Sequence, residues 1–417
     1  MGRQLYARFT TFRGSIDELD GYHEQLTGIS LRRDVGLFGN SKPLNTLPTP
    51  WPISVILPSL AMVQIALFDL LTSFGLRPDI VMGHSAGETS LLYASGAASK
   101  RIAMEVAVVR GREMTLVEEA GGGMAALSCA PFQADEIITS AKSSLGDGIL
   151  DIACYNGPKA IAIAGERRLV ARAVELATDR GILARTIQTN VAVHSEMMNV
   201  CQDSYRTCMG EVFARAGGSL VPTVTTYSTA TGSLLHGFTA DYFWQSSRGP
   251  VRFSQTVRAV LRSHPSAHFI EMSPHAVLSL YLQELGAPAS SILCPMRRTK
   301  TYEDHQEETV LLTAIGRLVT TGYNGVDFRA LSEVETLDRS TELPPYPFVR
   351  KTIPYLPACS TILRRQLGGV VRPLSGDGLR VNQATHPELA QHVINQEPIM
   401  PAAGYLEMVC PPNSRFS

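Results

Sequence analysis

The sequence has little charge and no paired cysteines, and each shortage excludes a class of protein. Charged residues make up 18% of the 417 positions, and 37 Lys and Arg balance 38 Asp and Glu. At a formal net charge of −1, no surface for nucleic acid is expected. The seven cysteines form no C-x-x-C pair, which argues against a disulfide framework and a zinc site. We therefore expect reduced, mostly buried cysteines in a cytoplasmic protein without a metal.

The sequence also lacks an unbroken apolar run of the kind that spans a membrane. Its most apolar stretch, residues 53–76, is interrupted by Pro58, Gln64 and Asp69. The later half has amphipathic helical spacing, which predicts a helix that faces the core. Residues 1–4 continue into polar, helix-like sequence and do not resemble a signal peptide. We expect no contact with a membrane.

What the sequence does contain is a serine in a sharp-turn motif. Residues 83–88 read Gly-His-Ser-Ala-Gly-Glu and follow the apolar residues 80–82 directly. A strand, a tight turn and a helix together present a nucleophilic hydroxyl, with the amide of Ala86 and the positive end of the helix facing a developing oxyanion. G-x-S-x-G alone arises often by chance. The flanking strand and helix, and Glu88, favour a catalytic Ser85.

Two residues could complete a site around this serine. His194 ends the apolar run Val-Ala-Val-His and is the best candidate for a base, although most histidines are exposed or satisfied in the core. Arg110 lies 25 residues after Ser85. It could be a surface arginine near a helix end, or a guanidinium fork that grips a substrate carboxylate.

The chain is long enough for two or three units. Residues 1–127 and 191–299 alternate helix-like and strand-like segments, which predicts an α/β fold with a parallel sheet. The segments from 124 to 190 follow a β-α-β-β-α-β order, so we expect a ferredoxin-like small subdomain over 128–190. Residues 300–375 read as a helix at 307–321 and a Pro-rich linker. Residues 376–417 are too few to bury a core alone.

These motifs resemble the acyltransferase domain of type I polyketide and fatty acid synthases. The resemblance rests on residues 83–88, Arg110 and the Val-Ala-Val-His at 191–194, and it covers roughly residues 1–355. Within the family, the sequence is most similar in character to the fungal highly reducing polyketide synthases. Further matches lie at residues 122–126, 227–232, 250–253, 269–275 and 343–348. The fold implied is a hydrolase-like, parallel-sheet large subdomain with an inserted ferredoxin-like small subdomain.

The resemblance also implies roles for individual residues. Ser85 corresponds to the acylated nucleophile, His194 to its general base and acid, and Arg110 to the residue that pairs with a malonyl carboxylate. The Ala86 amide corresponds to an oxyanion donor. The family needs no acidic third member beside its Ser–His pair.

Substrates and partners follow from the same resemblance. The family moves malonyl-type units from malonyl-CoA to the phosphopantetheine thiol of an acyl carrier protein, alongside other synthase domains and without a bound cofactor. His84 and Val193 are expected to contact the substrate. Related domains carry Phe at the position of Val193 for malonyl and Ser for methylmalonyl. Valine matches neither, so malonyl is expected only because the sequence resembles fungal synthases.

The two ends of the sequence depart from this pattern. Family members open with a strand ending in a Gly-Gln-Gly-like motif whose glutamine serves the oxyanion hole, and this sequence begins with the residues that follow it. Residues 376–417 resemble the start of a hotdog-fold dehydratase domain, whose signature is H-x-x-x-G-x-x-x-x-P. His392 and Pro401 keep its spacing, and Gln396 replaces the glycine. His392 corresponds to the dehydratase base, but the site is incomplete, so dehydration is not expected.

Two other interpretations stay open. The chain could be a non-catalytic fragment, or an incomplete gene model, of a larger synthase. It could also be a serine hydrolase, which would require an acid between serine and histidine and water as the acceptor.

Overall fold

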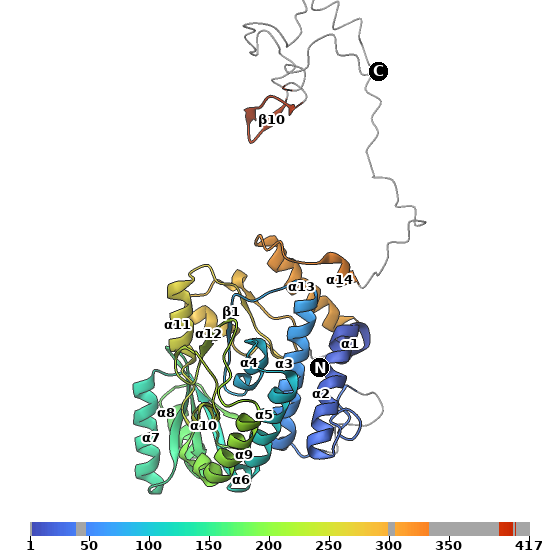
Figure 1. Cartoon of the computed structure of the whole chain (residues 1–417). Helices are drawn as coiled ribbons and strands as arrows, with labels where there is room; N and C mark the ends of the chain where they lie inside the picture. The colour runs from blue at the N-terminus through green and yellow to red at the C-terminus, as the bar shows by residue number, and fades with distance from the viewer. Residues whose placement is uncertain (1, 39–46, 299–304, 333–391, 403–404, 406–417) are drawn as a thin grey trace, which may run out of the picture. The chain divides into compact units, whose positions relative to one another are not determined.

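The structure is a computed structural model that describes residues 2–38, 47–298, 305–332, 392–402 and 405. The chain divides into two compact units, Met1–Leu337 and Asp338–Ser417. The first unit holds almost all of the described helices and strands (Figure 1). It is a mixed α/β fold, as the sequence predicts.

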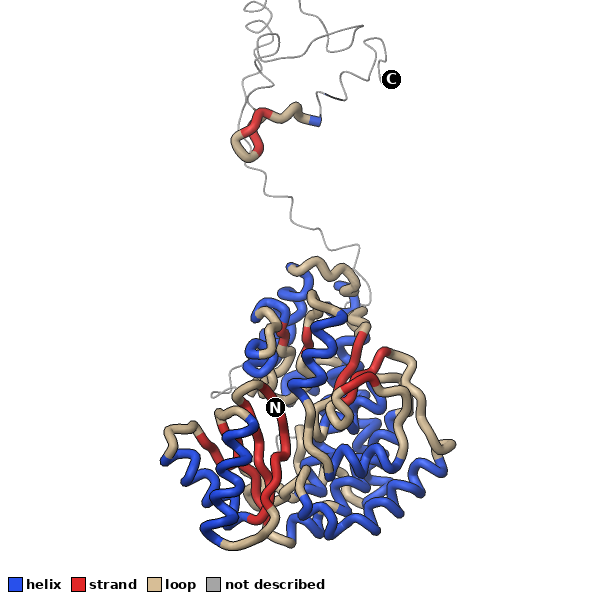
Figure 2. Tube along the Cα trace, turned by 90° about the vertical axis from the view of Figure 1, so that its left-hand side faces the viewer, coloured by secondary structure: helices blue, strands red, loops and turns tan. Residues whose placement is uncertain are grey.

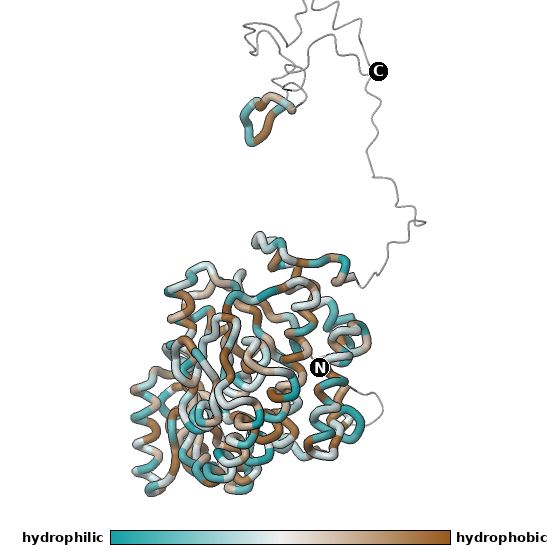
Figure 3. Tube along the Cα trace, in the orientation of Figure 1, coloured by the Kyte–Doolittle hydropathy of each residue, from teal (hydrophilic) through white to brown (hydrophobic). Residues whose placement is uncertain are grey.

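A long apolar helix, α3 (Ile53–Ser73), lies at the centre of the N-terminal part of the first unit. It packs against α2 (Thr10–Thr27) and α5 (Lys100–Glu113). Among the described helices, only α3 is long and apolar enough to cross a membrane, by length and composition alone. Figure 3 shows it as one of the brown, hydrophobic stretches of the chain. Its Met62, Ala66 and Leu67 are fully buried in the core, so the core-facing helix expected from the sequence is present.

The strand that precedes the serine turn is β1 (Ile80–Met82), and α4 (Gly87–Ala94) follows the turn. β1 pairs in parallel with β6 (Thr225–Ser228), and β6 pairs antiparallel with β7 (Ser233–Leu234). A second parallel pair joins β8 (Phe269–Ile270) to β9 (Ile292–Leu293). The expected parallel pairing is therefore present as short strands in two separate sheets.

A four-stranded antiparallel sheet forms the middle of the chain. Its elements follow the predicted β-α-β-β-α-β order, and the strands lie in the spatial order β3-β4-β2-β5. The helices α7 and α8 cover one face (Figure 2), and residues of the other face join the large hydrophobic core. The bounds are β2 (Gly122–Leu127), α7 (Pro131–Leu145), β3 (Leu150–Gly157), β4 (Ala160–Glu166), α8 (Arg167–Asp179) and β5 (Ala184–Ile187).

Helices and 3₁₀ turns make up most of the rest of the first unit. They are α1 (Arg3–Arg8), α6 (Thr115–Glu119), η2 (Glu196–Cys201), α9 (Gln202–Arg215), α10 (Ala240–Arg248), α11 (Phe253–Ser263), α12 (Ser279–Glu284), η3 (Ala289–Ser291), α13 (Gln306–Thr320) and α14 (Phe328–Ser332). The five cysteines in the described residues are free.

The helix expected at 307–321 is present as α13, and it contacts the N-terminal residues of the chain. The carboxylate of Glu307 accepts hydrogen bonds from the backbone N–H groups of Gly2 (2.6 Å) and Gln4 (2.8 Å). Leu311 and Ile315 are buried in the core. An apolar face and a buried carboxylate thus attach α13 to the rest of the first unit. The Pro-rich residues 343–348 lie outside the described residues.

In the second unit, the described residues form a hairpin of β10 (Val393–Ile394) and β11 (Glu397–Pro398). Asn395 and Gln396 form its turn with φ of 51° and 67°. This left-handed region favours glycine, which the dehydratase signature has at the position of Gln396. His392 is exposed, and its Nδ1 lies 2.8 Å from the carbonyl oxygen of Ile399. Residues 386–391 lie outside the described residues, and the dehydratase likeness stays a prediction.

Candidate active site

Ser85 lies on a tight turn between β1 and α4. Its φ is 53°, a left-handed conformation that costs energy for any residue other than glycine. Gly83 lacks a side chain for a steric reason, since a Cβ there would lie 2.8 Å from the Glu88 carboxyl carbon. The turn closes through the N–H of Gly87, which donates to the carbonyl of His84 at 2.9 Å. The local sequence therefore builds the sharp turn that the motif predicts.

His194 is the hydrogen-bond partner of this serine. Ser85 Oγ lies 2.8 Å from His194 Nε2, and His194 Nδ1 lies 2.9 Å from the carbonyl oxygen of Gly249. A carbonyl can only accept, so Nδ1 carries the proton and Nε2 is free to accept from the serine hydroxyl. The pair can act as nucleophile and general base although the imidazole is oriented by a backbone carbonyl and not by an acid.

Burial keeps this histidine neutral. His194 is only 2% exposed. Burial, followed by the positive charge of Arg110, lowers the pKa of His194 to about 4, against the opposing effect of the Gly249 hydrogen bond. The imidazole is thus unprotonated at neutral pH and ready to take a proton.

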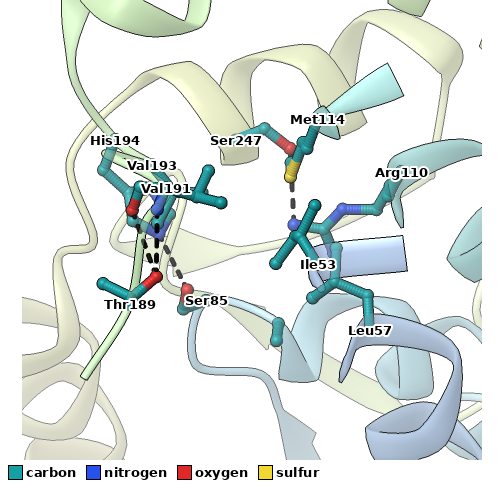
Figure 4. A pocket seen from close by; sticks show the side chains of 11 residues that line it. Ile53, Leu57, Ser85, Arg110, Met114, Thr189, Val191, Val193, His194 and Ser247 are labelled. Carbon is teal, nitrogen blue, oxygen red and sulfur yellow. Dashed lines mark hydrogen bonds between the residues drawn. The ribbon is translucent and has the colours of Figure 1, made fainter. Parts of the chain in front are cut away.

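A cavity of about 120 Å³ separates this pair from Arg110. Ser85 and His194 lie on one side of it, and the guanidinium of Arg110 points in from the other (Figure 4). Most of the remaining lining is apolar. The lining residues are Ile53, Leu57, Ser85, Ala86, Arg110, Met114, Thr189, Val191, Val193, His194 and Ser247. An acyl group with a terminal negative charge matches such a cavity in chemistry.

Arg110 is buried, which excludes the surface arginine considered from the sequence. It is 2% exposed, and its Nη1 donates to Thr89 Oγ1 at 2.6 Å and its Nη2 to Ser247 Oγ at 3.3 Å. Its Nε has no partner among the described residues. Because a guanidinium has five N–H donors, three remain for a ligand. A carboxylate would satisfy two of them at once.

Glu88 forms a second buried cluster behind the serine turn. Its Oε1 accepts from the backbone N–H (2.9 Å) and hydroxyl (2.8 Å) of Thr229, and its Oε2 accepts from Tyr242 OH at 2.5 Å. Burial raises the pKa of Glu88, while these hydrogen bonds and the charge of Arg110 oppose the rise. The cluster ties the start of α4 to the end of β6 and to α10.

The four-stranded sheet contacts the segments of both Ser85 and His194 through β3. Asn156 Oδ1 lies 2.8 Å from Nε2 of His84, next to the serine, and Asp151 Oδ2 accepts from the N–H of Glu196 at 2.8 Å, two residues after the histidine. The His84 ring also packs against Phe253, with centroids 5.2 Å apart. β3 thereby helps to hold the two segments together.

The structure brings some of the predicted site residues together around one cavity and places others elsewhere. Ser85, Ala86, Arg110, Val193 and His194 meet around one cavity. His84 is not among the described residues that line this cavity, and its ring contacts Asn156. Its contact with a substrate stays a prediction. His392 belongs to the second unit.

Sequence reasoning missed the partners that orient these groups, Thr89, Ser247 and Gly249. Thr89 is adjacent to the motif, so its place on α4 could have been noticed. Ser247 and Gly249 carry no signal, because they meet Arg110 and His194 only through the fold.

Comparison with known proteins agrees with this geometry. Residues 1–324 match the family model described as the acyl transferase domain. A highly reducing polyketide synthase of Strobilurus tenacellus is 43% identical over 412 residues, which is 98% of this chain and 15% of the relative. A phenolphthiocerol synthesis polyketide synthase of Mycobacterium marinum is 32% identical over 84% of this chain and 17% of its own length. The chain therefore spans less than a fifth of these relatives.

Solved structures show the same fold. The acyltransferase domain from the second module of the salinomycin polyketide synthase has a TM-score of 0.66 at 27% identity, covering 82% of this chain and 75% of that one. A loading acyltransferase from the avermectin synthase has a TM-score of 0.65 at 26% identity, covering 76% and 95%. The family model matches more than half of this chain. The chain therefore belongs to the acyl transferase domain family, as found in polyketide synthases.

Proposed function

We propose that this chain transfers a malonyl-type acyl group from coenzyme A to an acyl carrier protein through an ester on Ser85, as a step of polyketide biosynthesis. One observation carries the proposal. A serine bonded to a neutral histidine at 2.8 Å faces, across one cavity, a buried arginine with an unpaired Nε.

In the first half-reaction, the acyl group moves from coenzyme A to Ser85. Nε2 of His194 takes the hydroxyl proton while Oγ attacks the thioester carbonyl. The Ala86 amide and the N-terminus of α4 face the oxyanion that forms. The Gly249 carbonyl holds the imidazolium through its Nδ1 proton. When the tetrahedral intermediate collapses, the C–S bond breaks and the coenzyme thiolate leaves with the proton from Nε2.

In the second half-reaction, the phosphopantetheine thiol of a carrier protein attacks the ester carbonyl. His194 takes the thiol proton and returns it to Ser85 Oγ as the ester bond breaks. The carrier protein and the other synthase domains act as partners, and the transfer needs no bound cofactor.

Arg110 selects the acyl group in this proposal. Its free N–H groups would bind the terminal carboxylate of a malonyl unit in two parallel hydrogen bonds, which an acetyl unit cannot accept. Val193 lines the same cavity and would contact the carbon between the two carbonyl groups. We take malonyl as the substrate because the chain shares 43% identity with a fungal highly reducing synthase.

We also propose a subdomain organisation for the fold. Residues 1–127 and 191–299 form the hydrolase-like large subdomain, and 128–190 form a ferredoxin-like small subdomain. The element order and the strand order β3-β4-β2-β5 support a ferredoxin-like small subdomain, whose first strand, β2 (Gly122–Leu127), lies directly before residue 128. Residues 376–417 are taken as the beginning of a dehydratase domain, on the spacing of His392 and Pro401.

Mass spectrometry of the purified chain tests the function. After incubation with malonyl-CoA, we expect one malonyl adduct on the peptide that contains Ser85 and none in Ser85→Ala. Carrier protein should discharge the ester faster than water does. An unmodified wild-type chain would identify a non-catalytic fragment. Discharge to water at the same rate as to carrier protein would identify a serine hydrolase.

A further inference from the structure

The C-terminal end of α10 contacts both sides of the active site. The carbonyl oxygen of Ser247 accepts the backbone N–H of His194 at 2.9 Å, and its hydroxyl accepts Nη2 of Arg110 at 3.3 Å (Figure 4). Ser247 is therefore hydrogen-bonded to both His194 and Arg110.

The hydroxyl of Ser247 also contacts two groups of the core. It is fully buried, lies 2.8 Å from the carbonyl of Phe243 and lies 2.9 Å from Tyr205 OH. A serine hydroxyl has one hydrogen and two lone pairs. When it donates to the Phe243 carbonyl, both lone pairs are used by Tyr205 and Arg110. In this arrangement every bonding position of the oxygen is occupied, and the two core partners fix its place beside the guanidinium.

Arg110 is consequently held at both terminal nitrogens before any ligand arrives. Thr89 bonds Nη1 and Ser247 bonds Nη2, while Phe243 lies beneath the guanidinium with its ring centroid 5.9 Å away. A long side chain that is ordered in advance loses less conformational entropy when it binds a ligand. The Nε of Arg110 has no hydrogen-bond partner among the described residues.

We propose that Ser247 is a specificity-determining positioning residue, which sets the Arg110 guanidinium in the orientation that binds a substrate carboxylate. The proposal rests on the transfer of a malonyl-type group proposed above. It assigns to Ser247 an effect on thioesters that carry a carboxylate and none on those that lack one.

The neighbouring serine provides a matched control. Ser246 is 3% exposed, lies on the same helix and donates to the same Phe243 carbonyl at 3.1 Å. In the described structure its hydroxyl bonds to Phe243 and not to Arg110. Ser246→Ala and Ser247→Ala thus remove the same atom from adjacent buried positions, and only the second removes a partner of the arginine.

The test compares acylation of Ser85 by malonyl-CoA and acetyl-CoA in the full chain. For Ser247→Ala we expect kcat/KM with malonyl-CoA to fall about tenfold, the size of one lost hydrogen bond to a charged group, with the acetyl-CoA value within about twofold of wild type. Ser246→Ala should keep the wild-type ratio of the two constants. Equal losses with both thioesters, or equal ratios in the two variants, would overturn the proposal.

A second variant covers the case in which Ser247→Ala does not fold. Tyr205→Phe removes the other hydroxyl that bonds Ser247, and it should lower the malonyl-to-acetyl ratio by a few-fold. An unchanged ratio there would overturn the proposal as well. Failure of the wild-type chain to prefer malonyl-CoA is a separate result, because it would count against the proposed function itself.

Discussion

Two buried polar clusters include residues of α4, and they differ in whether every polar group is hydrogen-bonded. Glu88 and Thr89 are consecutive residues of the helix, and each belongs to a different cluster. Glu88 accepts hydrogen bonds from Thr229 and Tyr242, and each of its carboxylate oxygens is bonded. Thr89 bonds Arg110, whose Nε is left without a partner in the described residues.

The difference distinguishes a cluster that stabilises the fold from a residue that is available to bind a ligand. Buried polar groups are nearly always bonded within the protein, so a bonded carboxylate such as Glu88 is accounted for by the fold. A buried donor that the fold leaves unpaired needs another explanation, and at Arg110 the adjacent cavity provides one. We therefore expect changes at Glu88 to affect stability and changes at Arg110 to affect substrate choice.

The largest effect should come from Glu88→Ala. Removing the carboxylate leaves the Thr229 N–H and the Tyr242 hydroxyl buried without an acceptor, and leaves Arg110 without its nearby opposite charge. We expect the free energy of unfolding to fall by about 3–5 kcal/mol, as measured by urea denaturation. A loss below about 1 kcal/mol, or an altered malonyl-to-acetyl ratio in the folded fraction, would break the distinction between the clusters.

Arg110→Ala should change the choice between the two thioesters more than it changes stability. We expect kcat/KM for acylation by malonyl-CoA to fall about a hundredfold, since two charge-assisted hydrogen bonds are lost, while the acetyl-CoA value stays near wild type. Steady-state acylation kinetics with both thioesters measures this. Because Thr89 and Ser247 are uncharged, unfolding should be affected less than in Glu88→Ala. Equal loss with both thioesters would place Arg110 among the supporting residues.

The smallest effect concerns pH. Burial lowers the pKa of His194 to about 4, so the acylation rate with acetyl-CoA should stay level from pH 7 to about 5 and fall by half near pH 4. The charge of Arg110 contributes to this lowering, so in Arg110→Ala the fall should begin at higher pH. A Tyr242→Phe variant in the other cluster should leave the profile unchanged. Half-loss of the wild-type rate near pH 6.5 would contradict the assignment.

Stability has its own pH dependence from the same histidine. In the unfolded chain His194 takes up a proton near its ordinary pKa of about 6.5, whereas in the folded protein it resists protonation until about pH 4. The unfolded state thus binds more protons between these values, and the free energy of unfolding should decrease as pH falls from 6.5 to 4.

The sequence predicts several features of this protein correctly, and they share a physical cause. The turn at Ser85 follows from short-range sterics, because Gly83 leaves room for Glu88 and Gly87 begins a helix. The segments of the four-stranded sheet follow from alternating apolar residues and turn residues over short distances. Ser85, His194 and Arg110 were named together through motif resemblance, and the fold brings them to one cavity.

Other features depend on contacts between distant parts of the chain. Local pattern predicts the helix α13, but it does not predict that the Glu307 carboxylate accepts from the N–H groups of Gly2 and Gln4, about three hundred positions earlier. The contact between the His84 ring and Asn156 on β3 also joins distant segments. Neither partner can be identified from local composition.

The sequence by itself determined the nucleophile turn, the helix that follows it and the residue types needed for acyl transfer, because these depend on neighbours within a few positions. Only the tertiary structure decided how those residues behave. The Gly249 carbonyl selects the tautomer of His194, burial lowers its pKa, and the Nε of Arg110 is left without a partner among the described residues. Hydrogen-bond partners and burial are set by packing between distant segments, such as Arg110 and Ser247, which are 137 positions apart, and no local pattern records them.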